Sequence, residues 1–213
     1  LLDEVDRGPE PGELRAGLGL AAEQPLLALL PGSRPQEVSQ ILPRLLEGIE
    51  PLRREGTAVV TSRAPGLPEA LFARAGAAGA VLWRQEAAAL VRAADAALVA
   101  SGTATLETGL AGTPLGVVYR TGFLNWHLAR ALVKIRTVGL VNIAAGGTRV
   151  PELLQGDLTP SRVERLARRL LFDPVEREEQ KRYLAPLAER LGGGGSAERA
   201  ADAVLEVLEE VRR

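Results

Sequence analysis

The sequence predicts an α/β fold, a Rossmann-like parallel β-sheet with helices on both faces, from two observations. The first is a set of short, unbroken apolar runs such as Leu26–Leu30 and Ala96–Ala100, typical of strands buried on both faces of a parallel sheet. The second is that each of these runs leads through a turn containing glycine and serine into a segment of helical periodicity. Such units predict right-handed crossovers, with ligands in the crevice beyond the carboxyl ends of the strands.

The first half of the chain alternates between strand and helix patterns. Residues 1–24 are a polar lead-in with one helical turn near Glu13–Leu18. A long amphipathic helix is then expected from Val38, Ile41, Leu42, Leu45, Leu46, Ile49 and Leu52. Further strands are expected at Ala58–Thr61 and Ala80–Trp83, and helices at Pro68–Ala75 and Glu86–Ala93. This alternation is typical of βαβ units.

The turn Ser101–Thr103, with the sequence Ser-Gly-Thr, is the first candidate binding site. A helix is expected to follow it and to end at Gly112. Backbone N–H groups at the start of a helix, together with the helix dipole, form a binding site for an anion such as phosphate. Glu107, one turn into the helix, could accept hydrogen bonds from a diol such as ribose. The spacing equally fits an ordinary turn in which Thr103 is the N-cap and the dipole favours Glu107.

A second turn of the same kind, Pro31–Arg34, follows the strand Leu26–Leu30. Ser33 with Gln36 forms a capping-box pattern for the helix that follows, and Pro35 is tolerated in its first turn. Both turns come at the carboxyl ends of expected parallel strands, so we expect them on the same rim of the sheet. Two phosphate-competent turns on one rim favour an anion site more than either turn does alone.

The second half of the chain is expected to be richer in helices. Strands are expected at Leu115–Tyr119 and Val138–Ile143, the latter followed by a glycine-rich loop, and helices at Pro160–Phe172 and Val175–Ala185. Asn142, at the end of the last expected strand, is either an ordinary turn residue or a ligand contact. The glycines at 192–195 divide a Rossmann-like domain, residues 1–191, from a terminal helix within residues 196–213. That helix could dock on another domain or chain, or pack on its own sheet.

The segment Phe123–Arg136 is apolar with a basic stripe that includes His127, Arg130 and Lys134. A basic amphipathic helix can lie on a membrane surface or bind a partner. The same pattern also describes a half-buried core helix, and His127 fits a packed or solvent-facing residue better than a catalytic base.

Composition limits the classes of function. The net charge of −1 gives no basic field that would favour nucleic acid. The absence of cysteine and the single histidine argue against disulfides and against cysteine- or histidine-rich metal sites, and we expect no metal and no cofactor. No apolar run reaches the roughly 18 residues of a membrane span, so a cytoplasmic location is expected. Because the sequence contains no methionine, we expect it to be a piece of a longer protein.

Several segments in register resemble one family, the lipid-A-disaccharide synthases, which are membrane-associated glycosyltransferases of the GT-B architecture. These segments are LLPGSRPQEV (29–38), ADAALVASGTATLETGLAGTPLGVVYR (94–120), FLNWHLARALVK (123–134), GLVNIAAG (139–146) and VPELLQ (150–155). The resemblance runs from about Leu26 to the C-terminus, and it implies the C-terminal half of a GT-B enzyme, which binds the donor.

The resemblance implies transfer of 2,3-diacylglucosamine from its UDP derivative to 2,3-diacylglucosamine 1-phosphate, which forms the β-1,6-linked lipid A disaccharide without a metal. Arg34 is expected to bind the diphosphate and, with Asn142, to act in catalysis, while Glu107 holds the ribose. The expected substrate-binding residues are Gly32, Ser33, Arg34, Ser101, Gly102, Thr103, Thr105, Glu107 and Asn142. The helix at Phe123–Arg136 is expected to contact the inner membrane from the cytoplasmic side, and a homodimer is left open.

The chain departs from the family pattern in three places. The family loop usually reads AGRE before VPELLQ, but here Arg149 follows Gly146, Gly147 and Thr148, so that arginine is displaced. The segment Trp83–Glu86 is short, which leaves the uracil pocket unassigned. The sequence does not include the family's N-terminal half, which the resemblance implies would carry the acceptor site and the general base. Two alternatives stay open: a related UDP-N-acetylglucosamine transferase or epimerase, and a non-catalytic module that keeps the fold for association.

Overall fold

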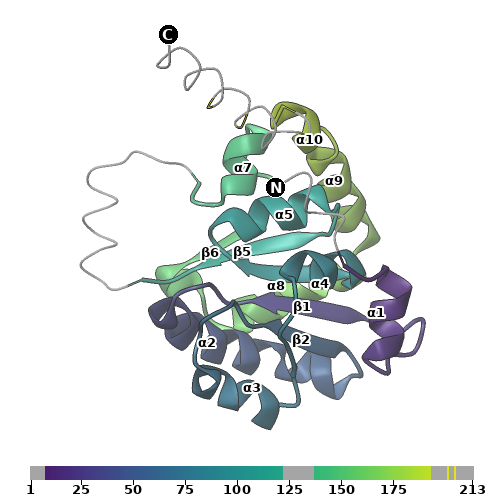
Figure 1. The fold of residues 1–213 in the computed structure, drawn as a ribbon, viewed down its shortest axis with the longest axis vertical. Helices are drawn as coiled ribbons and strands as arrows, with labels where there is room; N and C mark the ends of the chain where they lie inside the picture. The colour runs from purple at the N-terminus through teal and green to yellow at the C-terminus, as the bar shows by residue number, and fades with distance from the viewer. Residues whose placement is uncertain (1–7, 122–136, 193–200, 202–203, 205–213) are drawn as a thin grey trace.

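The computed structural model describes residues 8–121, 137–192, 201 and 204, and these form a six-stranded sheet flanked by helices (Figure 1). The strands are β1 (Leu26–Leu30), β2 (Ala58–Ser62), β3 (Val81–Trp83), β4 (Ala96–Ala100), β5 (Leu115–Tyr119) and β6 (Glu152–Leu154). Their order in the sheet is β3-β2-β1-β4-β5-β6, and every neighbouring pair is parallel. The predicted fold class is confirmed.

Helices cover both faces of the sheet. One face packs against α2 (Pro35–Arg54), η2 (Glu69–Phe72), α3 (Ala73–Ala77) and α8 (Pro160–Phe172). The other face packs against α1 (Pro11–Gly17), α4 (Ala87–Ala93), α5 (Thr103–Leu110), α7 (Leu140–Ala145), α9 (Pro174–Leu184) and α10 (Leu187–Arg190). The central strands β1 and β4 are buried along their whole length, as their unbroken apolar runs predict.

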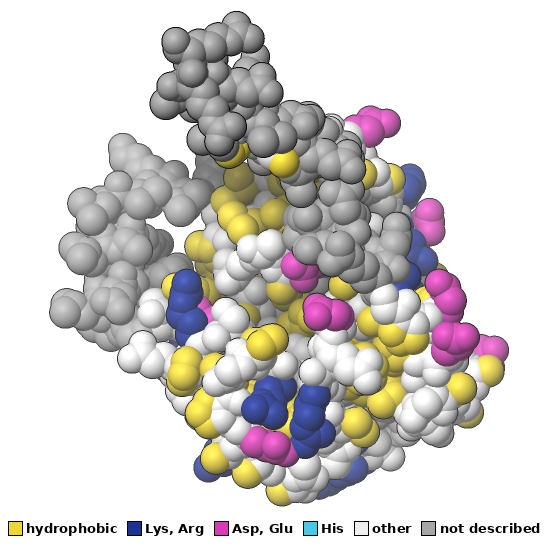
Figure 2. Space-filling model, in the orientation of Figure 1, with side chains coloured by type: hydrophobic (Ala, Val, Ile, Leu, Met, Phe, Trp, Pro, Cys, Tyr) yellow, Lys and Arg dark blue, Asp and Glu magenta, His cyan; other side chains and the backbone are white. Residues whose placement is uncertain are grey.

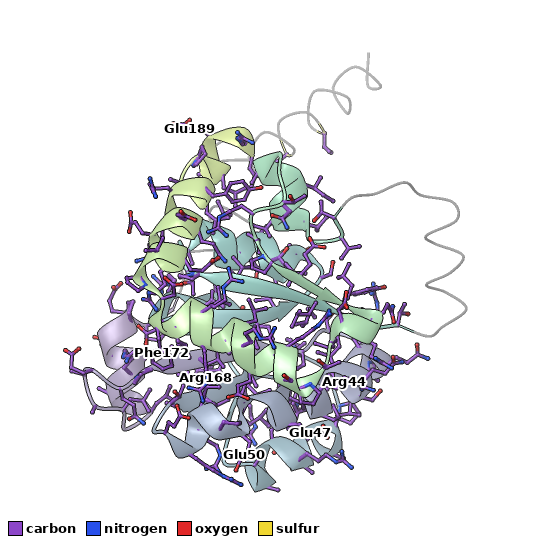
Figure 3. The ribbon with its side chains drawn as sticks, turned by 180° about the vertical axis from the view of Figure 1, so that it is seen from behind. Arg44, Glu47, Glu50, Arg168, Phe172 and Glu189 are labelled. Atoms are coloured by element: carbon purple, nitrogen blue, oxygen red, sulfur yellow. The ribbon has the colours of Figure 1, made fainter. Side chains whose placement is uncertain are left out.

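The helices α2 and α8 pack closely because one of them carries a glycine at the contact. A Cβ atom added at Gly48 of α2 would lie 2.6 Å from the Val163 side chain and from the Pro160 carbonyl oxygen. Figure 3 shows α8 lying along α2, with Arg168 of α8 near the C-terminal end of α2, where it pairs with Glu55. This close packing fixes α2, and with it the turn at the start of α2.

Two expectations about the second half of the chain are wrong. The segment expected as a strand at Val138–Ile143 contains the helix α7, which starts after Gly139 and ends at Gly146 in the left-handed conformation, φ +71°. The last strand is instead β6, three residues within VPELLQ, paired with β5. The segment Phe123–Arg136 and nearly all of the expected helix at Ala197–Val211 lie outside the described residues, and the domain limit at residue 191 stays a prediction.

Candidate functional site

A cleft of about 580 Å³ opens at the carboxyl ends of the strands. Its walls come from the turns that follow β1, β2, β3 and β4: Gly32–Arg34, Ser62–Pro65, Arg84–Ala88 and Ser101–Ala104. Glu37 of α2 and Glu107 of α5 also line it. Basic and acidic side chains lie next to one another on the face of the molecule in Figure 2. The structure therefore brings the two predicted turns together at one concave site, where α/β proteins of this kind bind ligands.

The turn after β4 presents the N-terminus of α5 to the cleft. Ser101 extends the β4 ladder by donating its N–H to the Val118 carbonyl oxygen at 3.0 Å. Gly102 is then the N-cap of α5 at φ +154°, a conformation that favours glycine. The first hydrogen bond of the helix runs from the Thr105 N–H to the Gly102 carbonyl oxygen, at 3.1 Å. The N–H groups of Thr103 and Ala104 precede that bond, so they have no partner within the helix and can donate to an anion in the cleft.

The Ser101 hydroxyl is not a phosphate donor in this arrangement. Its oxygen donates to the carbonyl oxygen of Val138 at 2.7 Å. A serine hydroxyl carries one proton, so the hydroxyl can only accept a further hydrogen bond. The Ser101 hydroxyl therefore acts as a tether to the segment before α7, and the backbone N–H groups of this turn remain as donors toward the cleft.

The turn after β1 adds an arginine to the lining of the cleft. Arg34 is the N-cap of α2, and its side chain, 78% exposed, pairs with the Glu37 carboxylate at 2.8 Å. An exposed pair of this kind contributes little to stability, so an anionic ligand can compete with the carboxylate for the guanidinium. Arg34 and the Ser101 turn line the same cleft, as the proposed phosphate site requires.

The predicted capping box at the start of α2, Ser33 with Gln36, is wrong. Glu37, not Gln36, accepts the Ser33 N–H, at 3.3 Å, and the Ser33 side chain does not cap the helix. Glu37 also explains the glycine in this turn. A Cβ atom at Gly32, where φ is +120°, would lie 2.6 Å from a carboxylate oxygen of Glu37.

Comparison with known proteins decides the family. Residues 1–205 match the family model described as lipid-A-disaccharide synthetase. The chain belongs to this family. The lipid-A-disaccharide synthase of Myxococcus xanthus is 42% identical over 212 residues, which are 96% of this chain and 55% of that protein. The synthase of Anaeromyxobacter dehalogenans strain 2CP-1 is 43% identical over 209 residues, 94% of this chain and 54% of that protein. The chain thus spans about half the length of these curated relatives.

Solved glycosyltransferases and related enzymes share the fold. WaaG, a glycosyltransferase involved in lipopolysaccharide biosynthesis, superposes with a TM-score of 0.56 at 20% identity over 93% of this chain and 52% of that one. A putative UDP-N-acetylglucosamine 2-epimerase from Listeria monocytogenes gives a TM-score of 0.60 at 16% identity over 98% of this chain and 51% of that one. The Rossmann-like half of the GT-B architecture is therefore confirmed for this member of the synthetase family.

Two residues predicted to bind substrate lie behind the cleft wall in this chain. Thr105 is fully buried, and its hydroxyl donates to the Gly102 carbonyl oxygen at 2.8 Å and accepts the Val141 N–H at 3.3 Å. Asn142 is also fully buried, and its amide exchanges two hydrogen bonds with the backbone of Val150, at 2.8 and 3.0 Å. Neither side chain lines the cleft, so the geometry gives both residues a structural role.

Arg149, the arginine displaced relative to the family loop, forms ion pairs with α9. Arg149 donates to Glu176 of α9 at 2.9 Å and also pairs with Glu179. Glu176 is 5% exposed and accepts a further hydrogen bond from Arg169. Burial raises the pKa of Glu176, but the hydrogen bonds from the two arginines outweigh burial and hold the pKa below its usual value of 4.5. Arg149 therefore ties the loop to α9 and is not one of the residues that line the cleft.

The sequence left two walls of the cleft unassigned. These walls are Ser62–Pro65 after β2 and Arg84–Ala88 after β3. The Trp83 indole N–H donates to the Glu86 carbonyl oxygen at 3.0 Å, and Arg84 pairs with Glu69 of η2. The signal that could have found these segments is their place after a strand, as for the other two turns.

The described part of the chain offers no evident metal site. Among residues 8–121 and 137–192, no group of three or more His, Cys, Asp or Glu side chains lies close enough together to hold a metal ion. Within the same residues, no helix is both long and apolar enough to cross a bilayer.

Proposed function

We propose that this chain is the donor-binding half of a lipid-A-disaccharide synthase. The enzyme would transfer 2,3-diacylglucosamine from its UDP derivative to 2,3-diacylglucosamine 1-phosphate. Membership of the family supports this assignment, and the observation that carries it is the cleft that Arg34 and the N-terminus of α5 both line. A diphosphate in that cleft would receive backbone N–H donors from one side and a guanidinium from the other.

The chemistry follows from where charge develops. When the glycosidic bond to the diphosphate breaks, negative charge grows on the leaving UDP. Fixed donors aimed at that charge stabilise the transition state more than the ground state. The N–H groups of Thr103 and Ala104 and the guanidinium of Arg34 would supply these donors, since all three residues line the cleft. Glu107, which lines the cleft one turn into α5, would accept hydrogen bonds from the ribose hydroxyls. The acceptor site and general base would come from the half of the family that this chain does not span.

The diacylated substrates favour action at the cytoplasmic face of the inner membrane. The apolar and basic composition of Phe123–Arg136 supports this proposal. So do two apolar side chains on α7, Leu140 and Ile143, which are 38% and 50% exposed. Association with a second copy of the chain stays a prediction.

Calorimetric titration with UDP tests the proposed function. We expect the wild-type chain to bind UDP, and Arg34→Ala and Glu107→Ala each to weaken binding by about tenfold, because each removes a hydrogen bond that involves a charged group. Arg54→Ala is the matched control, since Arg54 is an exposed arginine at the far end of the same helix. Its affinity should equal that of wild type. A folded wild-type chain that releases no heat with UDP would remove the proposal.

A further inference from the structure

The carboxylate of Glu152 on β6 holds the segment before α7. One oxygen accepts the N–H of Gly139 at 3.0 Å and the hydroxyl of Thr137, and the other accepts the N–H of Val138 at 3.0 Å. Three consecutive residues, 137–139, therefore bind one side chain. Gly139 permits this approach, because a Cβ atom there would lie 3.0 Å from the carboxylate and 2.9 Å from Val117.

A fourth donor binds the same carboxylate oxygen as Gly139 and Thr137. The side-chain amide of Asn142 donates to Glu152 at 2.9 Å, while Val150 fixes that amide through two backbone hydrogen bonds. Three of these donors share one carboxylate oxygen, Oε1, and the N–H of Val138 alone binds the other, Oε2. Glu152 also does not line the cleft. It is therefore suited neither to contact a ligand nor to act as a general base.

The segment 137–139, which Glu152 holds, also binds the turn Ser101–Thr103, where phosphate is proposed to bind. The carbonyl oxygen of Val138 accepts the hydroxyl proton of Ser101 at 2.7 Å. Ser101 immediately precedes Gly102, the N-cap of α5, so this bond sets where the N–H groups of Thr103 and Ala104 point. The path from carboxylate to cleft thus has two steps, Glu152 to Val138 and Val138 to Ser101.

We infer that Glu152 is a positioning residue for the diphosphate site, acting through Val138 on the turn at Ser101. This inference rests on the proposed function, because it takes the N-terminus of α5 as the place where phosphate binds. The carboxylate fixes the direction of the donors before ligand arrives, and such pre-organisation raises affinity without a direct contact.

A double-mutant cycle tests the path. Glu152→Gln turns an amide N–H₂ group toward donors that need an acceptor, and we expect it to weaken UDP binding on the order of tenfold. Ser101→Ala should weaken binding by a similar factor, and the double variant by little more than either alone, because the two bonds are successive steps of one path through Val138. Thr113→Val is the control for lost stability. It removes a buried hydrogen bond to Val91 at the opposite end of α5 and should lower the melting temperature without changing UDP affinity.

Each result decides the inference. Equal affinity for UDP in Glu152→Gln and wild type would overturn it. It would also be overturned if the fold-losses of UDP affinity in Glu152→Gln and Ser101→Ala multiplied in the double variant, because the two residues would then act independently. If Glu152→Gln does not fold, Thr137→Val serves in its place. This variant removes one of the four donors and should weaken binding about threefold, and an unchanged affinity would overturn the inference.

If wild type binds no UDP, the proposed function fails. The positioning is then read from amide NMR of the unliganded chain. Glu152→Gln should move the signals of Gly102–Ala104, and unmoved signals overturn the inference.

Discussion

Replacing Thr103 by proline is expected to weaken UDP binding by about 10- to 100-fold. Thr103 is the first residue of α5, the position at which proline is best tolerated in a helix. The substitution removes one backbone N–H from the proposed phosphate site but no hydrogen bond from the helix itself. A hydrogen bond to a charged group contributes about 1.5–3 kcal/mol, which corresponds to the expected range of affinities. Calorimetric titration of the variant with UDP gives the measurement.

The matched control for this variant is Thr103→Ala. It removes the same hydroxyl group but keeps the N–H, so it should retain most of the affinity for UDP. Equal melting temperatures for the two variants would show that α5 is intact in both. If Thr103→Pro bound UDP as tightly as Thr103→Ala, the N–H of residue 103 would have no part in binding.

The second large effect is on stability, and it comes from Glu176. We expect Glu176→Gln to lower the free energy of unfolding at neutral pH by about 2 kcal/mol, measured by urea denaturation. The carboxylate is buried between Arg149 and Arg169, and removing one partner of a buried ion pair leaves the other charges uncompensated. The expected effect is below the range for fully buried pairs because the arginine side chains are 31% and 51% exposed. Glu164→Gln, which breaks an exposed pair with Arg168, should cost less than about 1 kcal/mol.

The contribution of Glu176 should also depend on pH. Because its pKa in the folded chain is held below the usual 4.5, the unfolded chain binds the proton more readily. The stabilisation is therefore complete above about pH 4.5 and is lost as the pH falls through the lower pKa of the folded state. The difference in unfolding free energy between wild type and Glu176→Gln should shrink at acid pH. A difference that stayed constant down to pH values well below 4.5 would contradict this account.

The central part of the fold could be read from the sequence because its signals are local. The buried runs of β1 and β4 are apolar throughout, and the turns that follow them carry glycine where positive φ occurs, at Gly32 and Gly102. Since parallel strands end on one rim, the meeting of these two turns in one cleft followed from topology. Arg34 and Glu107 line that cleft for the same reason, and their roles in binding stay predictions.

The errors fall where long-range contacts decide the structure. The run Val138–Ile143 contains branched residues that favour a strand. In the structure the N–H groups of Val138 and Gly139 donate to the Glu152 carboxylate instead of to a neighbouring strand, and the helix starts at Leu140. The edge strand β6 is three residues long, too short for a periodic signal. The burial of Asn142 depends on Val150 and Glu152, eight and ten residues further along the chain, and no local pattern shows it.

The most direct test of the central claim is amide NMR of the chain titrated with UDP. The claim is that the nucleotide's diphosphate sits on the N-terminus of α5, facing Arg34. We predict the largest shifts at the N–H groups of Gly102, Thr103 and Ala104, with smaller shifts at the turn Gly32–Arg34. If UDP shifted signals elsewhere on the chain but left those of Gly102–Ala104 unchanged, the claim would be contradicted.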